Sequence, residues 1–139
     1  MKVLLLMVEK TENGICKIGL EDYSKRLSHY LPFEYKEIKN DQILRLLQPS
    51  DTVVLLDERG IERRSIEFAD WLQKKENSAK RLVFIIGGPF GFSKDVYDRA
   101  DEMISLSRMT FSHQMVRVIF TEQLYRACTI LKGEKYHHE

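Results

Sequence analysis

The sequence predicts an α/β protein in which helices cover a parallel sheet on both faces, in three layers. Apolar runs of strand length alternate along the chain with segments of helical spacing. Three of these runs, at residues 3–8, 52–56 and 82–86, are apolar without alternation, as is typical of strands buried on both faces. With 139 residues, 43% of them hydrophobic, and no linker-like break in composition, we expect one domain over residues 1–139.

The first half of the chain predicts two strands and two helices. Residues 3–8 form the first strand, and a helix over residues 20–31 follows, because its apolar positions share helical spacing up to Pro32. Residues 33–38 alternate like a half-buried edge strand. A short helix over residues 41–47 ends before Pro49.

The second half repeats the alternation of strand and helix. We expect a strand at residues 52–56 that stops at Asp57, a helix capped by Ser65, a strand at 82–86, a helix at 93–99, a short strand at 103–106, and a final helix at 113–131 that stops before Gly133.

The charge balance, the cysteines and the length of the apolar runs exclude several classes of protein. The 22 basic and 21 acidic residues give a net charge of +1, so any contact with nucleic acid must be local or shared between two subunits. The two cysteines are far apart, and no residues have metal-ligand spacing, so we expect no metal. The apolar run at residues 3–8 is too short for a membrane span and lacks a signal-peptide cleavage site. We therefore expect a cytoplasmic protein without membrane contact.

A glycine-rich turn, Gly87-Gly88-Pro89-Phe90-Gly91, follows the run at residues 82–86. Glycines let backbone amides approach a ligand closely, because no Cβ stands in the way. A dinucleotide-binding fold would place Gly-x-Gly-x-x-Gly after the first strand, where residues 9–12 are Glu-Lys-Thr-Glu. The turn is not a Walker phosphate loop either. A tight strand-to-helix connection without a ligand explains it equally well.

Three loops should meet at the carboxyl edge of the sheet: those after Leu56, Ile86 and Leu106. Open α/β sheets bind their ligands at this edge. Residues 106–111 mix apolar side chains with free backbone groups, which suits an adenine, although an ordinary loop with a buried Met109 and Phe111 is the simpler interpretation.

The start of the final helix carries two candidate site residues. His113 and Arg117 are one turn apart, close enough to act on a common anion or base edge, and an arginine among apolar neighbours needs a partner. The apolar arc of this helix is wider than one core-facing stripe requires. It indicates either a dimer interface or a helix buried deep in one subunit.

Together these segments resemble a known family. They are Leu55 to Gly60, Ile85 to Gly91, Ile104 to Ser107, Met109 to His113, Val116-Arg117, Glu122 to Ala127 and Tyr136-His137. The chain resembles the ribosomal RNA large subunit methyltransferase H family of the SPOUT superfamily, small bacterial enzymes that methylate N3 of a pseudouridine in 23S ribosomal RNA. The resemblance spans the whole chain and is densest from residue 82 onward.

The resemblance implies a C-terminal trefoil knot, which is rare in general, and S-adenosylmethionine (SAM) held by the knot loops. It also implies a homodimer with composite active sites that acts on large-subunit ribosomal RNA within the ribosome. The implied cofactor contacts fall on Leu56, Gly87, Leu106, Ser107, Arg108, Met109, Thr110 and Phe111.

For catalysis, we hypothesise that His113 and Arg117 orient the base or stabilise its charge, while Tyr136 and His137 close over it from the tail. Several relatives carry a basic arginine after the Tyr-His pair, where this chain has His138. The alternatives are a SPOUT methyltransferase for another RNA such as transfer RNA, a non-catalytic ribosome-associated protein, and a regulatory nucleotide-binding domain.

Overall fold

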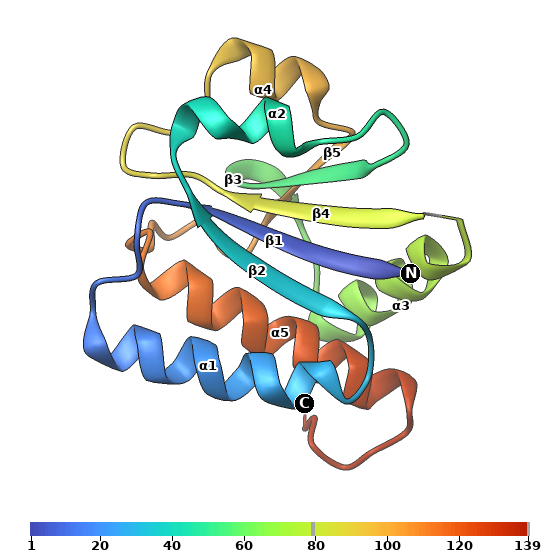
Figure 1. Ribbon diagram of the computed structural model, residues 1–139. Helices are drawn as coiled ribbons and strands as arrows, with labels where there is room; N and C mark the ends of the chain where they lie inside the picture. Colours follow the sequence, from blue (N-terminus) through green and yellow to red (C-terminus); the bar gives the residue numbers. More distant parts are fainter. Residues whose placement is uncertain (79, 139) are drawn as a thin grey trace.

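The protein is a parallel sheet with helices packed on both faces (Figure 1). The computed structural model describes residues 1–78 and 80–138. Its strands are β1 (Lys2–Val8), β2 (Phe33–Ile38), β3 (Thr52–Glu62), β4 (Arg81–Ile86) and β5 (Glu102–Ser105). Its helices are α1 (Gly14–Ser28), α2 (Ile43–Leu46), preceded by the 3₁₀ turn Asn40–Gln42, α3 (Ser65–Ser78), α4 (Lys94–Arg99) and α5 (Met115–Leu131).

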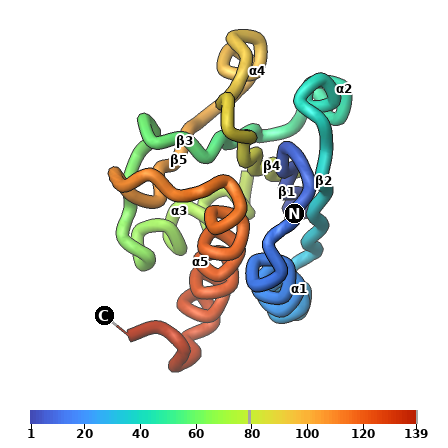
Figure 2. Tube along the Cα trace, turned by 90° about the vertical axis from the view of Figure 1, so that its left-hand side faces the viewer, coloured from blue at the N-terminus to red at the C-terminus, as the bar shows by residue number. Residues whose placement is uncertain are grey.

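The strand order is β2-β1-β4-β3-β5, and each neighbouring pair is parallel. The predicted α/β class with a parallel sheet is confirmed, as is the edge position of β2. Because parallel strands all end on the same side, the segments that leave β3, β4 and β5 meet at the carboxyl edge. Figure 2 looks onto this edge.

Two separate cores explain why the central strands are apolar without alternation. Leu5 of β1 and Phe84 of β4 face the layer that contains α1, α3 and α5. Leu6 and Ile85, their neighbours in sequence, face the layer that contains α2 and α4. Successive side chains of a strand point to opposite faces, so a sheet covered twice needs an apolar residue at every position.

Helix α1 begins six residues earlier than the sequence indicated, at Gly14 rather than residue 20. The side-chain oxygen of Asn13 accepts a hydrogen bond from the amide of Cys16 (3.1 Å) and so caps the helix. The prediction was wrong because Ile15 and Ile18, which are 81% and 70% exposed, do not follow the core-facing spacing. The Asn13 cap was the signal that could have corrected it.

Strand β3 does not stop at Asp57, contrary to the prediction. Leu56 and Ile61 both pair with Ile104 of β5, so residues 57–60 loop out between two paired segments. At the other elements the differences are small: Ser65 is the first residue of α3 rather than its cap, and α5 begins at Met115. Ser93 does cap α4 as expected, accepting from the amide of Val96.

The C-terminal tail folds back against the far half of α5. Gly133 has a φ of 71°, the left-handed conformation that ends a helix, as predicted. The Tyr136 hydroxyl donates to Glu122 (3.2 Å), and its ring packs edge-on against Tyr125. The tail therefore leaves the end of α5 that is far from the carboxyl edge of the sheet and turns back along the middle of the helix (Figure 1).

Both cysteines are free and buried. Burial raises the pKa of the Cys128 thiol to about 12, so this side chain stays protonated and unreactive at neutral pH. Within residues 1–78 and 80–138, no helix is long and apolar enough to cross a membrane.

A buried ion pair anchors the amino ends of β3 and β4. Arg81 binds Asp51 in a two-point contact, with Nε to Oδ1 at 2.8 Å and Nη2 to Oδ2 at 2.7 Å. The Asp51 side chain is fully buried and also accepts from the amide of Gln48. Burial alone would raise the pKa of Asp51, but the hydrogen bonds from Arg81 and Gln48 outweigh it and lower the pKa.

We predict that Asp51→Asn lowers the free energy of unfolding by about 3 kcal/mol, because it leaves Arg81 without its counter-charge. The folded-state pKa of Asp51 lies below its unfolded value, so the pair contributes fully above about pH 5 and is lost as the pH falls through the folded-state pKa. Denaturant unfolding over a pH series should show wild type and variant converging in acid. A gap that stays constant down to about pH 2 would contradict this assignment.

Candidate functional site

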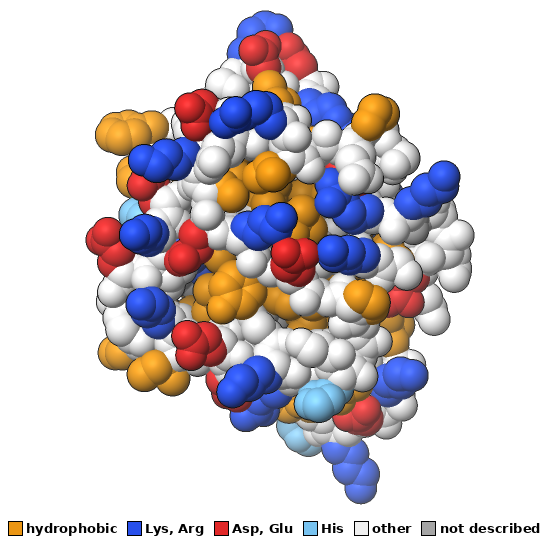
Figure 3. Space-filling view, in the orientation of Figure 1, with side chains coloured by type: hydrophobic (Ala, Val, Ile, Leu, Met, Phe, Trp, Pro, Cys, Tyr) orange, Lys and Arg blue, Asp and Glu red, His pale blue; other side chains and the backbone are white. Residues whose placement is uncertain are grey.

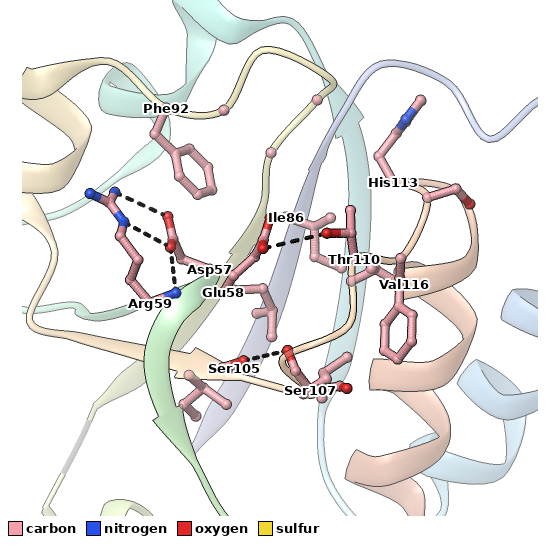
Figure 4. A pocket seen from close by; sticks show the side chains of 18 of the residues that line it. Asp57, Glu58, Arg59, Ile86, Phe92, Ser105, Ser107, Thr110, His113 and Val116 are labelled. Atoms are coloured by element: carbon pink, nitrogen blue, oxygen red, sulfur yellow. Dashed lines mark hydrogen bonds and ion pairs between the residues drawn. The ribbon is translucent and has the colours of Figure 1, made fainter.

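The three loops at the carboxyl edge enclose one cavity of about 690 Å³ (Figure 4). One wall is formed by residues 56–59, another by residues 86–89, 91 and 92, and the third by residues 104–107, 109–113 and 116. This volume lies within the range of about 300–1,000 Å³ that is usual for small-molecule and cofactor sites. The sequence prediction that these three loops meet is confirmed.

The loop after Leu56 places an ionised carboxylate in the wall. Asp57 accepts hydrogen bonds from the amide of Arg59 (2.9 Å) and from the hydroxyl of Tyr97 (2.5 Å). Burial alone would raise the pKa of Asp57, but the hydrogen bonds from Tyr97 and Arg59 outweigh it and lower the pKa. The Arg59 guanidinium lies 4.8 Å from the centre of the Tyr97 ring and completes the cluster. Asp57 is thus a fixed negative charge at the cavity.

Gly60 ends this loop in close contact with β5. A Cβ at residue 60 would lie 2.6 Å from backbone atoms of Met103 and Ile104, so no other residue fits without moving one of the strands. This close approach lets the chain rejoin β5 after residues 57–60 have turned away toward the cavity.

The glycine-rich loop after β4 is a compact turn. The amide of Gly91 donates to the carbonyl of Gly88 (3.1 Å), and Gly91 has a φ of 74°, which favours glycine. A Cβ at Gly87 would lie 3.2 Å from the Phe92 ring. Gly87 and the Phe92 ring both line the cavity, and the lack of a Cβ at Gly87 lets the ring lie against its backbone.

The loop after β5 is held by its own serines. Ser105 donates to the carbonyl of Ser107 (2.9 Å), and the Ser107 hydroxyl accepts from the amide of Met109 (3.0 Å). Thr110 donates to Glu58 (3.5 Å) and links this loop to the one after Leu56, as Figure 4 shows. The backbone of this loop is therefore ordered beside the apolar side chains of Leu106 and Phe111, a combination that suits a planar heterocycle.

The cavity brings together most of the predicted cofactor residues. Leu56, Gly87, Leu106, Ser107, Met109, Thr110 and Phe111 line it, together with His113. Figure 4 shows His113 on the side opposite Asp57 and Arg59. Arg108 does not line it: its side chain is 94% exposed and lies 3.6 Å from Glu62.

Arg117 is fully buried and does not line the cavity. Its guanidinium donates to the carbonyl of Val8 (2.7 Å) and the hydroxyl of Thr11 (2.6 Å), and it lies 3.7 Å from the Glu37 carboxylate. An arginine at this position does have partners, as expected: they belong to the end of β1, the loop after it and β2, and Nε also donates to the backbone carbonyl of His113 (3.1 Å). The structure does not bring Arg117 and His113 to a common anion, because the guanidinium points into the protein.

Tyr136 and His137 are also remote from the cavity of their own chain. Nδ1 of His137 lies 3.0 Å from Arg126, whose guanidinium lies 4.8 Å from the centre of the Tyr136 ring. Both tail residues are therefore held by Glu122 and Arg126, which lie 7 and 11 residues after the start of α5, about 10–17 Å along the helix from its cavity end.

Several residues at the cavity were missed from sequence. Asp57, Arg59, Phe92 and Tyr97 all line it; the loops after Leu56 and Ile86 had been singled out from sequence, but no site role had been assigned to these residues. A charged residue directly after a buried parallel strand was a usable signal for Asp57. Tyr97 had none, because its bond to Asp57 spans 40 positions of sequence. In the part of the chain that the structure describes, no group of three or more His, Cys, Asp or Glu side chains could hold a metal ion.

The fold is that of the SpoU-type methyltransferases. The A. aeolicus TrmH/SpoU tRNA modifying enzyme matches 96% of this chain and 78% of its own, with a TM-score of 0.52 and 12% identity. The methyltransferase AviRb from Streptomyces viridochromogenes, solved in complex with the cofactor AdoMet, matches 96% of this chain and 59% of its own, with a TM-score of 0.52 and 14% identity.

Sequence comparison is more specific. Residues 1–137 match the family model described as "Predicted SPOUT methyltransferase". The ribosomal RNA large subunit methyltransferase H of Cytophaga hutchinsonii is 52% identical, over 99% of this chain and all of that protein. Its namesake from Bacteroides fragilis is 50% identical over the full length of both chains. The chain belongs to the ribosomal RNA large subunit methyltransferase H family of SPOUT methyltransferases.

We predict that Gly60→Ala deforms the site, because the new methyl group must displace the backbone of β5. Its melting temperature should fall by about 4 °C or more, which corresponds to about 1–2 kcal/mol. Ligand affinity at the cavity should fall with it. Gly14→Ala is the matched control, since nothing lies within 4 Å of its Cβ position. Equal thermal stability of the two variants would show that the contact with β5 does not constrain the loop.

Proposed function

We propose that this protein transfers the methyl group of SAM to N3 of a pseudouridine in 23S ribosomal RNA, on the assembled ribosome. The observation that carries the proposal is the cavity formed by the three carboxyl-edge loops, in a chain about half identical to ribosomal RNA large subunit methyltransferases H over its whole length. The AdoMet bound by the fold relative AviRb supports the cofactor.

The residues at the cavity fit SAM. The apolar side chains of Leu106 and Phe111 suit the faces of an adenine, and the Gly87 backbone can approach it without a Cβ. Asp57 supplies an ionised carboxylate for the ammonium or hydroxyl groups of the cofactor. SAM supplies an electrophilic methyl group on a sulfonium when it is bound.

The chain's main contribution to the reaction is positioning. Well-oriented reactants can gain effective molarities up to about 10⁵–10⁸ M, and the three hydrogen-bonded loops provide a rigid wall for that purpose. The target N3 of the base must also lose its proton as the N–C bond forms. His113 lines the cavity and is the side chain we assign to orient the base or accept that proton.

We propose a homodimer in which each tail completes the site of its partner. Tyr136 and His137 are bound to Glu122 and Arg126 of α5 and do not line the cavity of their own chain, which supports a role in the site of another subunit. Ile15 and Ile18 of α1 and Met115 of α5 are exposed side chains on packed neighbouring helices, which supports a second copy covering this face. The trefoil knot and the cytoplasmic location are part of the same proposal.

The direct test is methyl transfer from radiolabelled SAM to ribosomes that lack the modification, with the methylated position mapped by nuclease digestion and mass spectrometry. Label at N3 of a pseudouridine in 23S RNA is expected, and intact ribosomes should be preferred over free RNA. Label in another RNA, or none, would refute the proposal.

The same assay separates His113 from Arg117. We predict that His113→Ala lowers kcat about 10²-fold, with little change in stability or in SAM affinity by calorimetry. Arg117→Met should instead lower the free energy of unfolding by about 3 kcal/mol, because it leaves the Val8 carbonyl and Glu37 without their buried partner. Unchanged turnover for His113→Ala would remove it from the site.

A complementation experiment tests the composite site. His113→Ala and a chain truncated before Tyr136 should each be inactive alone. Mixed and reassembled in equal amounts, they should regain about a quarter of wild-type activity, since half of the dimers are then mixed and each has one intact site. If each site used its own tail, no mixture would regain activity.

A further inference from the structure

A second, smaller cavity of about 270 Å³ adjoins the first. It lies between the start of α3, the side of α5 and the loop after β5, and it shares Leu106 and Phe111 with the larger cavity. Its polar lining comes from Arg63, Arg64 and Ser65 before and within α3, and from Gln123 of α5. A group bound there would be separated from the methyl-donor cavity only by the loop that forms the common wall.

Arg63 has an unused donor at this cavity. Its guanidinium lies 5.4 Å from the centre of the Trp71 ring, which holds it in place. Nη1 is shielded from solvent and has no hydrogen-bond partner among residues 1–78 and 80–138. A buried donor without an acceptor costs about 1–3 kcal/mol, and more when it is charged, so this atom calls for an explanation.

The carboxylates nearest to Arg63 in sequence, and the one at the start of β5, already have other partners. Glu62 pairs with Arg108, and Glu67 accepts from the amide of Arg64. Glu102 accepts from Trp71 and pairs with Lys75. Ser65 donates its hydroxyl to Gln123 (2.8 Å), which fixes the polar wall opposite Arg63. An acceptor for Nη1 therefore has to come from outside the described residues of this chain, and a molecule bound in the cavity is one source that the test below separates from a partner subunit.

We propose that Arg63 binds a backbone phosphate of the substrate RNA next to the target nucleotide, with Arg64 as a second cation at the rim. The inference rests on the proposed function for the identity of the ligand. Arginine presents paired donors that match phosphate oxygens, and the Trp71 ring holds the Arg63 guanidinium beside the cavity. The cavity has room for a phosphate and not for a second cofactor.

The charge distribution favours such a local contact. The net charge is only +1, and acidic and basic side chains are interspersed on the face that Figure 3 shows. Affinity for RNA that came from a broad basic surface would require a large excess of Lys and Arg. A few well-placed arginines beside the cavity can instead hold the RNA in register while base contacts are made elsewhere.

The test is the salt dependence of binding to large ribosomal subunits, measured by co-sedimentation with wild type, Arg63→Gln, Arg63→Lys and the control Lys74→Gln. Lys74 lies on α3, the helix that follows Arg63; its side chain is 76% exposed and pairs with Asp70, so the control removes one charge outside the cavity. Arg63→Gln should weaken binding several-fold and reduce the slope of log K against log salt by about one. Arg63→Lys should keep the slope, and Lys74→Gln should match wild type.

Calorimetry with SAM, sedimentation velocity and thermal melting accompany these measurements. SAM affinity and oligomeric state should be unchanged in Arg63→Gln. If this variant is unfolded, Arg64→Gln takes its place, and it must reduce the slope as well. An unaltered slope in a folded variant overturns the phosphate site, and so does dissociation of a dimer, which would give Nη1 an acceptor from the partner subunit.

The outcome is separable from that of the proposed function. Methylation of 23S RNA by wild type, together with an unaltered slope in Arg63→Gln, would leave the enzyme activity standing and remove the phosphate site. A reduced slope in Arg63→Gln, together with no methylation by wild type, would support the phosphate site and refute the proposed enzyme activity.

Discussion

The close contact between Gly60 and the backbone of β5 is the constraint on which the shape of the site depends. A Cβ at this position would lie 2.6 Å from backbone atoms of β5. Because glycine has none, the chain can leave the sheet after Leu56, present Asp57 to the cavity, and rejoin β5 at Ile61. The position of β5 in turn sets where residues 106–111 begin and where α5 starts. One glycine thus places two of the three cavity walls, while the parallel register of β3 and β4 places the third.

Arg117 makes the complementary contact on the other side of the cavity. Its bonds to Val8, Thr11 and Glu37 tie the start of α5 to the ends of β1 and β2. The desolvation of a full guanidinium is costly unless its donors are paired, and here a backbone carbonyl, a hydroxyl and a nearby carboxylate serve that role. We therefore regard Arg117 as the residue that fixes the start of α5 next to His113, rather than as a group that contacts the substrate.

Sequence reasoning was reliable wherever burial on both faces determined the residue type. The apolar runs that became β1, β3 and β4, and the capped start of α4, are local patterns whose meaning depends little on distant residues. The meeting of three loops also followed from sequence, because parallel strands end on one side. The early start of α1 was missed because its exposed isoleucines broke the periodic pattern. The bonds between Tyr97 and Asp57, and between Arg117 and Val8, join positions 40 and 109 apart, and no local pattern records such pairs.

The central claim is that the three carboxyl-edge loops act as one binding site for SAM. Hydrogen–deuterium exchange of the native protein, with and without saturating SAM, tests it most directly. The account predicts slower exchange at residues 56–60, 87–92 and 106–111 together, with α2 unchanged, because only the loops contact the ligand. Protection confined to one loop, or protection centred away from this edge while SAM is bound, would contradict it.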